Sequence, residues 1–120
     1  MWRGVSKSPE EYAAWFTDLV KEDLASAVQV AQAVAALREE GPALGRPLVD
    51  RIQRSKVHNL KELRPGSAGR SEIRVLFAFD PTRSALLLLG GDKAGNWQRW
   101  YRQNIPIAEQ LYLEYPEQQE

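Results

Sequence analysis

Cysteine is absent from the 120 residues of this chain, and histidine and methionine each occur once. The absence of cysteine excludes a disulfide framework, thiol catalysis and zinc sites built on thiolates. One histidine is too few for a histidine-rich metal site. We therefore expect the protein to work without a bound metal or other cofactor.

The sequence also lacks long hydrophobic runs. Its longest, residues 85–89, has the length of a buried strand and is far too short to span a membrane. The N-terminus leads into acidic residues without an apolar segment, so it has no feature of a secretory signal. We expect a cytoplasmic protein that has no membrane partner.

Net charge is absent too, because 16 Lys and Arg balance 16 Asp and Glu. The charges are nevertheless segregated along the chain. Residues 46–104 hold 12 basic and 5 acidic side chains, residues 1–45 hold 4 and 7, and residues 105–120 hold 0 and 4. A basic middle between acidic ends predicts a polyanionic partner that meets the middle segment alone.

The remaining composition is that of a globular protein, with 43% apolar and 27% charged residues. A chain of this length can bury one substantial core but not two. We expect a single domain that comprises residues 1–120.

Two helices are predicted in the first third of the chain. The run Ser8-Pro9-Glu10-Glu11 indicates a helix start, with Ser8 as the N-cap and Pro9 at the first position. A second helix is expected over residues 22–40, ended by Gly41. Its apolar residues recur at helical spacing and predict a buried stripe: Leu24, Val28, Ala31, and Val34 or Ala35, together with the nearby Ala27 and Leu37.

Strands are predicted in the middle of the chain, because apolar residues alternate there between turn residues. We expect an antiparallel sheet of three strands and a short C-terminal helix, which with the helical hairpin make an α+β domain. The strands are expected at residues 57–64, 71–79 and 84–90, the helix at 106–115, a weak strand at 1–5 and an unassigned connector at 48–55.

The first two strands carry the most distinctive charges of the chain. By alternation, Glu62 and Arg64 share one face of the first strand, and Arg74 projects opposite the apolar residues of the second. Lys61 adds a further cation. Cations on a rigid sheet suit the binding or the chemistry of phosphates, although Arg74 could equally form a plain ion pair with Glu72 or Glu62.

Four segments, taken together and in order, resemble a known family. They are Gly-Pro-Ala-Leu-Gly-Arg-Pro (41–47), His-Asn-Leu-Lys-Glu-Leu-Arg (58–64), Arg-Ser-Glu-Ile-Arg-Val-Leu-Phe (70–77) and Gly-Asp-Lys-Ala-Gly-Asn-Trp (91–97). The sequence resembles the HigB-like branch of the RelE/ParE toxins of type II toxin–antitoxin systems. The resemblance implies a RelE-like fold, a ribosome-dependent endoribonuclease that cuts messenger RNA, and a cognate antitoxin, usually a helix-turn-helix DNA-binding protein.

The resemblance also implies roles for particular residues. Arg74 matches the arginine of the family's Tyr-Arg or Ile-Arg strand, which is its most dependable catalytic position. Glu62 and Arg64 match charged positions of the preceding strand, and Lys93 lies where relatives place basic residues after the last strand. Tyr101 is a candidate for the C-terminal His or Tyr of some relatives.

These residues suit RNA cleavage without a metal, in which the 2′-hydroxyl attacks the adjacent phosphate. Arg74 and Arg64 would stabilise the added negative charge, because a guanidinium donates bidentately to phosphate oxygens. Glu62 would act as a base or hold an arginine in place. Lys61 and Lys93 would contact phosphates or supply a proton.

Other cationic and aromatic side chains are candidates for contact with RNA or the ribosome. They are His58, Arg70, Arg54, Lys56, Trp97 and Tyr101, with Arg46, Arg51, Arg99, Arg102 and Trp100 as further contributors. Trp97 and Trp100 could instead close the core, and His58 could be a structural residue at a strand end. Two alternative functions remain open: a ParE-like inhibitor of DNA gyrase, and a non-catalytic nucleic-acid-binding module of the same fold.

Overall fold

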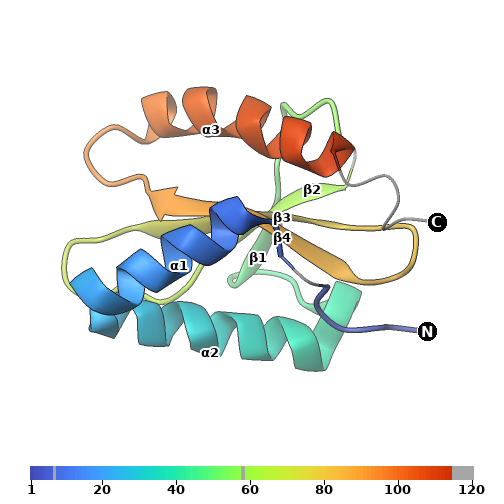
Figure 1. Cartoon of the computed structure of the whole chain (residues 1–120), viewed down its shortest axis with the longest axis horizontal. Coiled ribbons are helices and arrows are strands. Elements are labelled where there is room, and N and C mark those ends of the chain that lie inside the picture. Colours follow the sequence, from blue (N-terminus) through green and yellow to red (C-terminus); the bar gives the residue numbers. More distant parts are fainter. Residues whose placement is uncertain (7, 58, 115–120) are drawn as a thin grey trace.

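The computed structural model describes residues 1–6, 8–57 and 59–114. Helices α1 and α2 form an N-terminal hairpin, four strands form one sheet, and helix α3 follows the sheet (Figure 1). The elements are α1 (Glu10–Glu22), α2 (Leu24–Glu40), the 3₁₀ turn η1 (Gly41–Ala43), β1 (Val49–Arg51), β2 (Leu60–Leu63), β3 (Ile73–Phe79), β4 (Ala85–Asp92) and α3 (Trp97–Leu113).

The sheet has the order β1-β2-β3-β4, and every neighbouring pair is antiparallel. Figure 1 shows α1 and α2 on one face of this sheet and α3 on the other. The predicted α+β architecture is confirmed. The fold also contains β1, which pairs with β2 and lies in the connector that the sequence left unassigned.

Each face of the sheet carries its own hydrophobic cluster. Val75 and Phe77 of β3 are fully buried and pack with Val30 and Leu37 of α2. Leu76, which alternates with them, joins a second cluster beneath α3. Burial on both faces explains why β4 is continuously apolar from Ala85 to Leu89.

The buried side of α2 differs from the predicted stripe. Leu24 and Val28 are 61% and 45% exposed, and Ala31 and Ala35 are exposed as well. The buried residues are Ser26, Ala27, Val30, Ala33, Val34 and Leu37. The predicted Ala27, Val34 and Leu37 are therefore confirmed, whereas Ser26, Val30 and Ala33 were not predicted. Because alanine and valine occupy almost every side of this helix, apolar spacing alone does not determine which side packs.

Two predicted helix ends are also wrong. Helix α1 begins at Glu10 with Pro9 as its N-cap, and no side chain caps it, so Ser8 does not fill that role. Helix α3 is not short: it begins at Trp97, and Pro106 lies in its interior. Asn96 sets this earlier start, since its side-chain oxygen accepts a hydrogen bond from Arg99 N at 3.1 Å.

Two adjacent glycines let the helices approach both faces of β4. A Cβ on Gly90 would lie 2.4 Å from the Trp15 ring of α1, and one on Gly91 would lie 2.6 Å from the Trp100 indole of α3. These distances are too short for real contacts, so Gly90 allows the close packing of α1 on the sheet and Gly91 that of α3. The weak N-terminal strand is reduced to one bridge between Val5 and Ala85. Among the described residues, no helix is long and apolar enough to cross a membrane.

Candidate functional site

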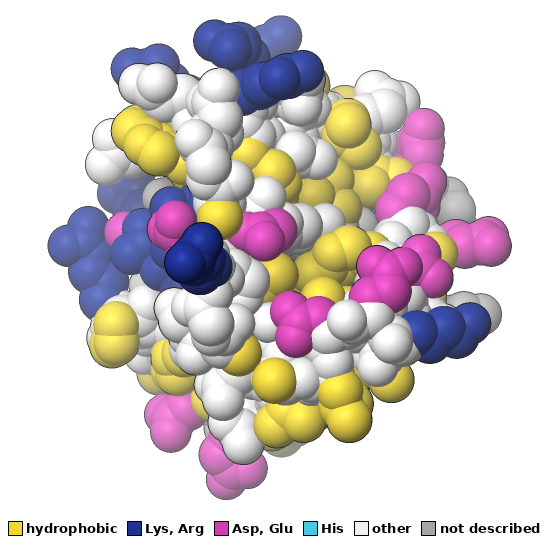
Figure 2. Space-filling view, turned by 90° about the vertical axis from the view of Figure 1, so that its left-hand side faces the viewer, with side chains coloured by type: hydrophobic (Ala, Val, Ile, Leu, Met, Phe, Trp, Pro, Cys, Tyr) yellow, Lys and Arg dark blue, Asp and Glu magenta, His cyan; other side chains and the backbone are white. Residues whose placement is uncertain are grey.

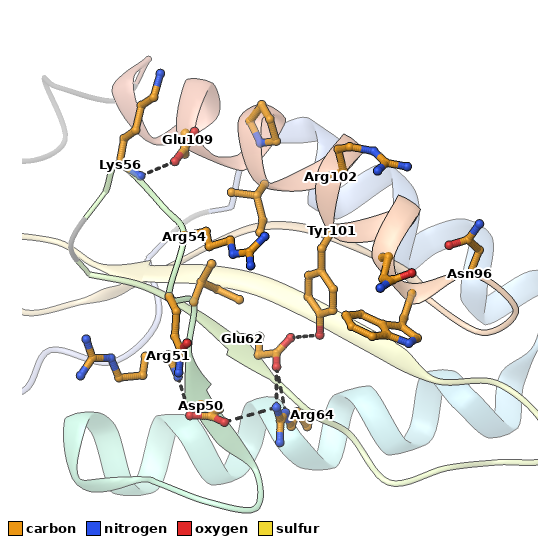
Figure 3. Close-up of a pocket in the computed structure, with 16 residues that line it drawn as sticks. Asp50, Arg51, Arg54, Lys56, Glu62, Arg64, Asn96, Tyr101, Arg102 and Glu109 are labelled. Carbon is orange, nitrogen blue, oxygen red and sulfur yellow. Dashed lines mark hydrogen bonds and ion pairs between the residues drawn. The ribbon is translucent and has the colours of Figure 1, made fainter.

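An open groove of about 1000 Å³ lies between α3 and the β1–β2 side of the sheet (Figure 3). Its floor includes Glu62 and Arg64, and Tyr101 reaches into it from α3. Its lining consists of Asp50, Arg51, Ile52, Gln53, Arg54, Lys56, Glu62, Arg64, Asn96, Trp97, Gln98, Tyr101, Arg102, Ile105, Pro106 and Glu109.

Glu62 is the best-connected residue of the groove and is only 3% exposed. Its Oε2 accepts a hydrogen bond from Arg64 Nε at 2.9 Å and forms an ion pair with Arg64 Nη2 at 2.8 Å. Its Oε1 accepts a hydrogen bond of 2.5 Å from the Tyr101 hydroxyl. A buried carboxylate is costly unless it is paired, and here both oxygens have donors.

Asp50 extends this arrangement onto β1, where it lies opposite Glu62 in the strand register. Its Oδ2 lies 3.3 Å from Arg64 Nη2 and 3.2 Å from Arg46 Nη2. The backbone N–H of Arg51 donates to Asp50, and this bond together with the two arginines lowers the pKa of the carboxyl. Burial alone would lower the pKa of Arg64, but its hydrogen bond to Glu62 and the charges of both carboxylates raise it.

Arg74 lies behind Glu62 and does not line the groove. Its Nε is 3.9 Å from Glu62 Oε1, and its side chain is 16% exposed. Nη1 donates to the Ile73 carbonyl at 2.8 Å. Among the described residues, none accepts a hydrogen bond from the buried Nε, so this N–H remains available as a donor close to Glu62. Glu62, Arg64, Arg74 and Tyr101 are called the Glu62 cluster below.

Tyr101 completes the cluster from the opposite wall. Burial, the hydrogen bond to Glu62 and the charge of Glu62 all raise the pKa of its hydroxyl, against the opposing effect of Arg74. The phenol therefore stays protonated and donates at neutral pH. Trp97 and Trp100 contact the Tyr101 ring edge-on, with ring centroids 6.3 and 5.2 Å away.

The upper part of the groove is cationic. Arg51, Arg54, Lys56 and Arg102 line it, and within the described ranges none of the four forms an ion pair. On the face of the molecule in Figure 2, most Lys and Arg side chains gather at the top and left, whereas acidic side chains predominate at the right. The separation of charge expected from the sequence is thus also a separation in space.

The structure separates several predicted site residues from the groove. Lys93 pairs with Glu72 at 3.2 Å at the end of β4. Lys61 alternates with Glu62 and so projects from the other face of β2, and Arg70 is exposed in the β2–β3 loop. None of these three lines the groove. His58 lies outside the described residues.

The two tryptophans have different environments. Trp100 packs against the hydrophobic cluster beneath α3, in agreement with the alternative that this residue closes the core. Trp97 is 56% exposed and lines the groove. Of the predicted contact residues, the groove also gathers Arg51, Arg54, Lys56, Tyr101 and Arg102.

Sequence reasoning missed Asp50 and Glu109. Asp50 could have been found if residues 48–55 had been interpreted as a strand beside residues 57–64. Glu109 has no signal in the sequence, because its partners Ser55 and Lys56 lie more than 50 positions away. The part of the chain that the structure describes contains no cluster of three or more His, Asp or Glu side chains that could hold a metal ion.

A groove with unpaired cations, an exposed indole and a rigid Arg–Glu cluster can bind a phosphodiester strand and stabilise negative charge on it. The sequence was also compared with known protein families. Residues 15–113 match the family described as phage derived protein Gp49-like (DUF891).

Two proteins of Mycobacterium tuberculosis are similar to the chain. One, named "Putative toxin HigB3", is 60% identical over 96 residues, which cover 80% of this chain and 79% of that protein. The other, named "Putative toxin HigB2", is 47% identical over 112 residues, which cover 93% of this chain but 54% of that protein. The chain therefore spans about half the length of HigB2. From the family match and the identity to HigB3, the chain belongs to the Gp49-like (DUF891) family and is a homologue of the HigB proteins.

Proposed function

We propose that this chain is the toxin of a type II toxin–antitoxin system, with a RelE-like domain that cuts messenger RNA on the ribosome. The names of its HigB relatives support the toxin role. The observation that best supports the nuclease is the Glu62 cluster, which sits at the floor of a cationic groove. The proposal treats the 120 residues as one domain in the cytoplasm.

In the proposed reaction the 2′-hydroxyl of the RNA gives its proton to water and attacks the adjacent phosphate. A 2′,3′-cyclic phosphate forms, and the expelled 5′-oxygen of the next nucleotide takes a proton from water. Negative charge then grows on the phosphate oxygens. Arg64 donates to these oxygens from the groove floor, and Arg74 adds its positive charge from behind. Preorganised cations of this kind stabilise a transition state more than a ground state.

Glu62 and Tyr101 keep this charge in place. Both oxygens of Glu62 are already engaged by Arg64 and Tyr101, so its role here is to orient the arginines and not to accept the proton of the 2′-hydroxyl. Tyr101 stays protonated because of its raised pKa and therefore continues to donate to Glu62 throughout the reaction.

The rest of the groove holds the RNA strand. Arg51, Arg54, Lys56 and Arg102 contact its phosphates, and the exposed face of Trp97 stacks on a base. A cognate antitoxin that covers these residues would prevent entry into the ribosome. Such an antitoxin is expected to be a helix-turn-helix DNA-binding protein.

The test is to map messenger RNA 5′-ends in cells after brief induction of the wild-type chain, Arg64→Ala and Arg74→Ala. Arg38→Ala is the matched control, because Arg38 is an exposed arginine on α2, on the opposite face of the sheet. We expect new ends inside translated regions for the wild type and Arg38→Ala, and none for Arg64→Ala, for Arg74→Ala or when translation is blocked.

Two results would contradict the proposal. Growth arrest with intact messages and damaged DNA would indicate a gyrase inhibitor that shares the fold. Growth inhibition that survives both Arg64→Ala and Arg74→Ala would indicate a module that binds nucleic acid without cutting it.

A further inference from the structure

Glu109 is an acidic side chain in the groove wall, beside the cations Arg54 and Lys56. A carboxylate there repels a phosphate strand, so its presence needs a structural reason. Its Oε2 accepts two hydrogen bonds from across the groove, from Ser55 Oγ at 2.9 Å and from the backbone N–H of Lys56 at 2.5 Å. Figure 3 shows this contact between α3 and the β1–β2 connection.

The contact organises the segment that carries two of the groove's cations. Ser55 Oγ, which donates to Glu109, also accepts a hydrogen bond from Val57 N at 2.9 Å. One carboxylate oxygen therefore holds Ser55 and Lys56 directly and Val57 through the Ser55 hydroxyl. Arg54 and Lys56, which belong to this segment, are exposed and form no ion pair within the described part of the chain.

We propose that Glu109 is a positioning residue, which ties the β1–β2 connection to α3 and thereby presents Arg54 and Lys56 to the phosphates of single-stranded RNA. The assignment rests on the proposed function, because RNA is the ligand that the groove binds there. Ordering the two long side chains before RNA arrives reduces the entropy lost on binding.

The proposal predicts an effect opposite in sign to that of charge alone. If Glu109 were only a negative charge near the RNA, its removal would strengthen binding. If it is a tether, its removal frees Arg54 and Lys56 and weakens binding, even though the net charge becomes more positive.

The experiment compares the wild type with Glu109→Ala and with Glu109→Gln, which keeps an acceptor oxygen. Glu114→Ala is the matched control, because Glu114 is exposed, lies just after α3 and, within the described ranges, hydrogen-bonds through its side chain to the Gln110 amide alone. The probe is a fluorescent single-stranded oligonucleotide of 2′-O-methyl RNA, which has no free 2′-hydroxyl to attack the phosphate. Its Kd is measured by anisotropy over a range of salt concentrations.

We expect the Kd of Glu109→Ala to rise about tenfold. Its salt dependence should become shallower by about 1.4 in log–log slope, since two phosphate contacts are lost. Glu109→Gln should recover most of the affinity, and Glu114→Ala should bind as the wild type does. An unchanged or lower Kd for Glu109→Ala would overturn the proposal.

Amide hydrogen exchange tests whether Glu109 holds the β1–β2 connection, independently of whether the groove binds RNA. In the free protein, the amides of Lys56 and Val57 should exchange about tenfold faster in Glu109→Ala than in the wild type. Equal exchange would overturn the tether, whatever the RNA result. If the wild type itself fails to bind the RNA while exchange responds as expected, the proposed function is wrong and the RNA-positioning role falls with it.

Discussion

Glu62 shows how single residues build this site from distant parts of the sequence. It is a nearly buried carboxylate whose donors are Arg64, which directly follows β2, and Tyr101 of α3. Burying a charge costs free energy that is recovered only when every partner is present. The free energy of unfolding should therefore respond to the loss of one donor more than to the loss of an ordinary surface contact.

Tyr101→Phe tests this dependence with the removal of one oxygen. We expect the free energy of unfolding to fall by about 1–3 kcal/mol, because Glu62 Oε1 loses the one hydrogen bond that it accepts from the described residues. Urea denaturation provides the measurement. Tyr112→Phe is the control, since no described residue hydrogen-bonds to that hydroxyl, and equal stability of the two variants would count against the role of Glu62.

The difference in stability between the wild type and Tyr101→Phe should also depend on pH. The pKa of Tyr101 is raised in the folded state above its ordinary value of 10.0. Below pH 10 both folded and unfolded chains keep the proton, so the stability difference between the wild type and Tyr101→Phe is constant. Above pH 10 the unfolded chain loses the proton first, and the difference should narrow as the pH rises. A difference that widens in alkali would contradict the raised pKa.

Local alternation was enough to place Glu62, Arg64 and Arg74 on one face of the sheet. It could not place Glu109, whose partners are brought near it only by the packing of α3. Lys93 was associated with the site by its position in the sequence, but two residues beyond Gly91 it meets Glu72 at the end of the sheet.

Among the elements, α3 has the largest effect on the site, because it supplies Tyr101, Trp97, Arg102 and Glu109. Its distance from the sheet is set where the Trp100 indole lies over Gly91. A change at that contact should reach the Glu62 cluster through the helix.

Gly91→Ala tests this coupling away from the groove. The added Cβ would meet Trp100 Nε1 at 2.6 Å, so the indole and the adjoining turn of α3 must shift. We expect a loss of about 1–3 kcal/mol in stability from overpacking and reduced RNA cleavage under conditions where the variant is folded. Gly45→Ala is the control, because no atom lies within 4 Å of its Cβ. Full cleavage by folded Gly91→Ala would contradict the coupling.

The helices were also the least predictable elements. The apolar character of α2 on nearly all sides concealed which side packs, and Pro106 suggested a helix start where α3 in fact continues. Proline favours a first helical position, but here the Asn96 cap and the packing of Trp100 establish the helix at Trp97, well before Pro106. The strands were placed better, since the large apolar residues Ile73, Val75, Phe77 and Phe79 of β3 recur at every second position between turn residues.

For the whole molecule, a formal charge of zero at pH 7 coexists with a cationic groove. A polyanion senses the local field and not the sum, because salt screens charges more than about 10 Å away. Retention on a polyanion should therefore depend on where a charge is removed.

We expect the wild type to bind heparin at low salt and the double variant Arg54→Ala/Lys56→Ala to elute at lower salt. The control is Arg3→Ala/Arg38→Ala, which removes the same charge from exposed residues that do not line the groove. Elution of both variants at the same salt concentration would show that the groove has no special affinity for polyanions.

We propose that the groove promotes cleavage of messenger RNA on the ribosome, with the 2′-hydroxyl of the RNA as the attacking group. The most direct measurement uses purified ribosomes stalled on a defined message, made either with ribose throughout or with one 2′-deoxynucleotide at the cut position. We predict that the wild type cuts the first message to leave a 2′,3′-cyclic phosphate, spares the second, and loses activity in Arg64→Ala. Equal cutting of both messages, or full activity in Arg64→Ala, would contradict the account.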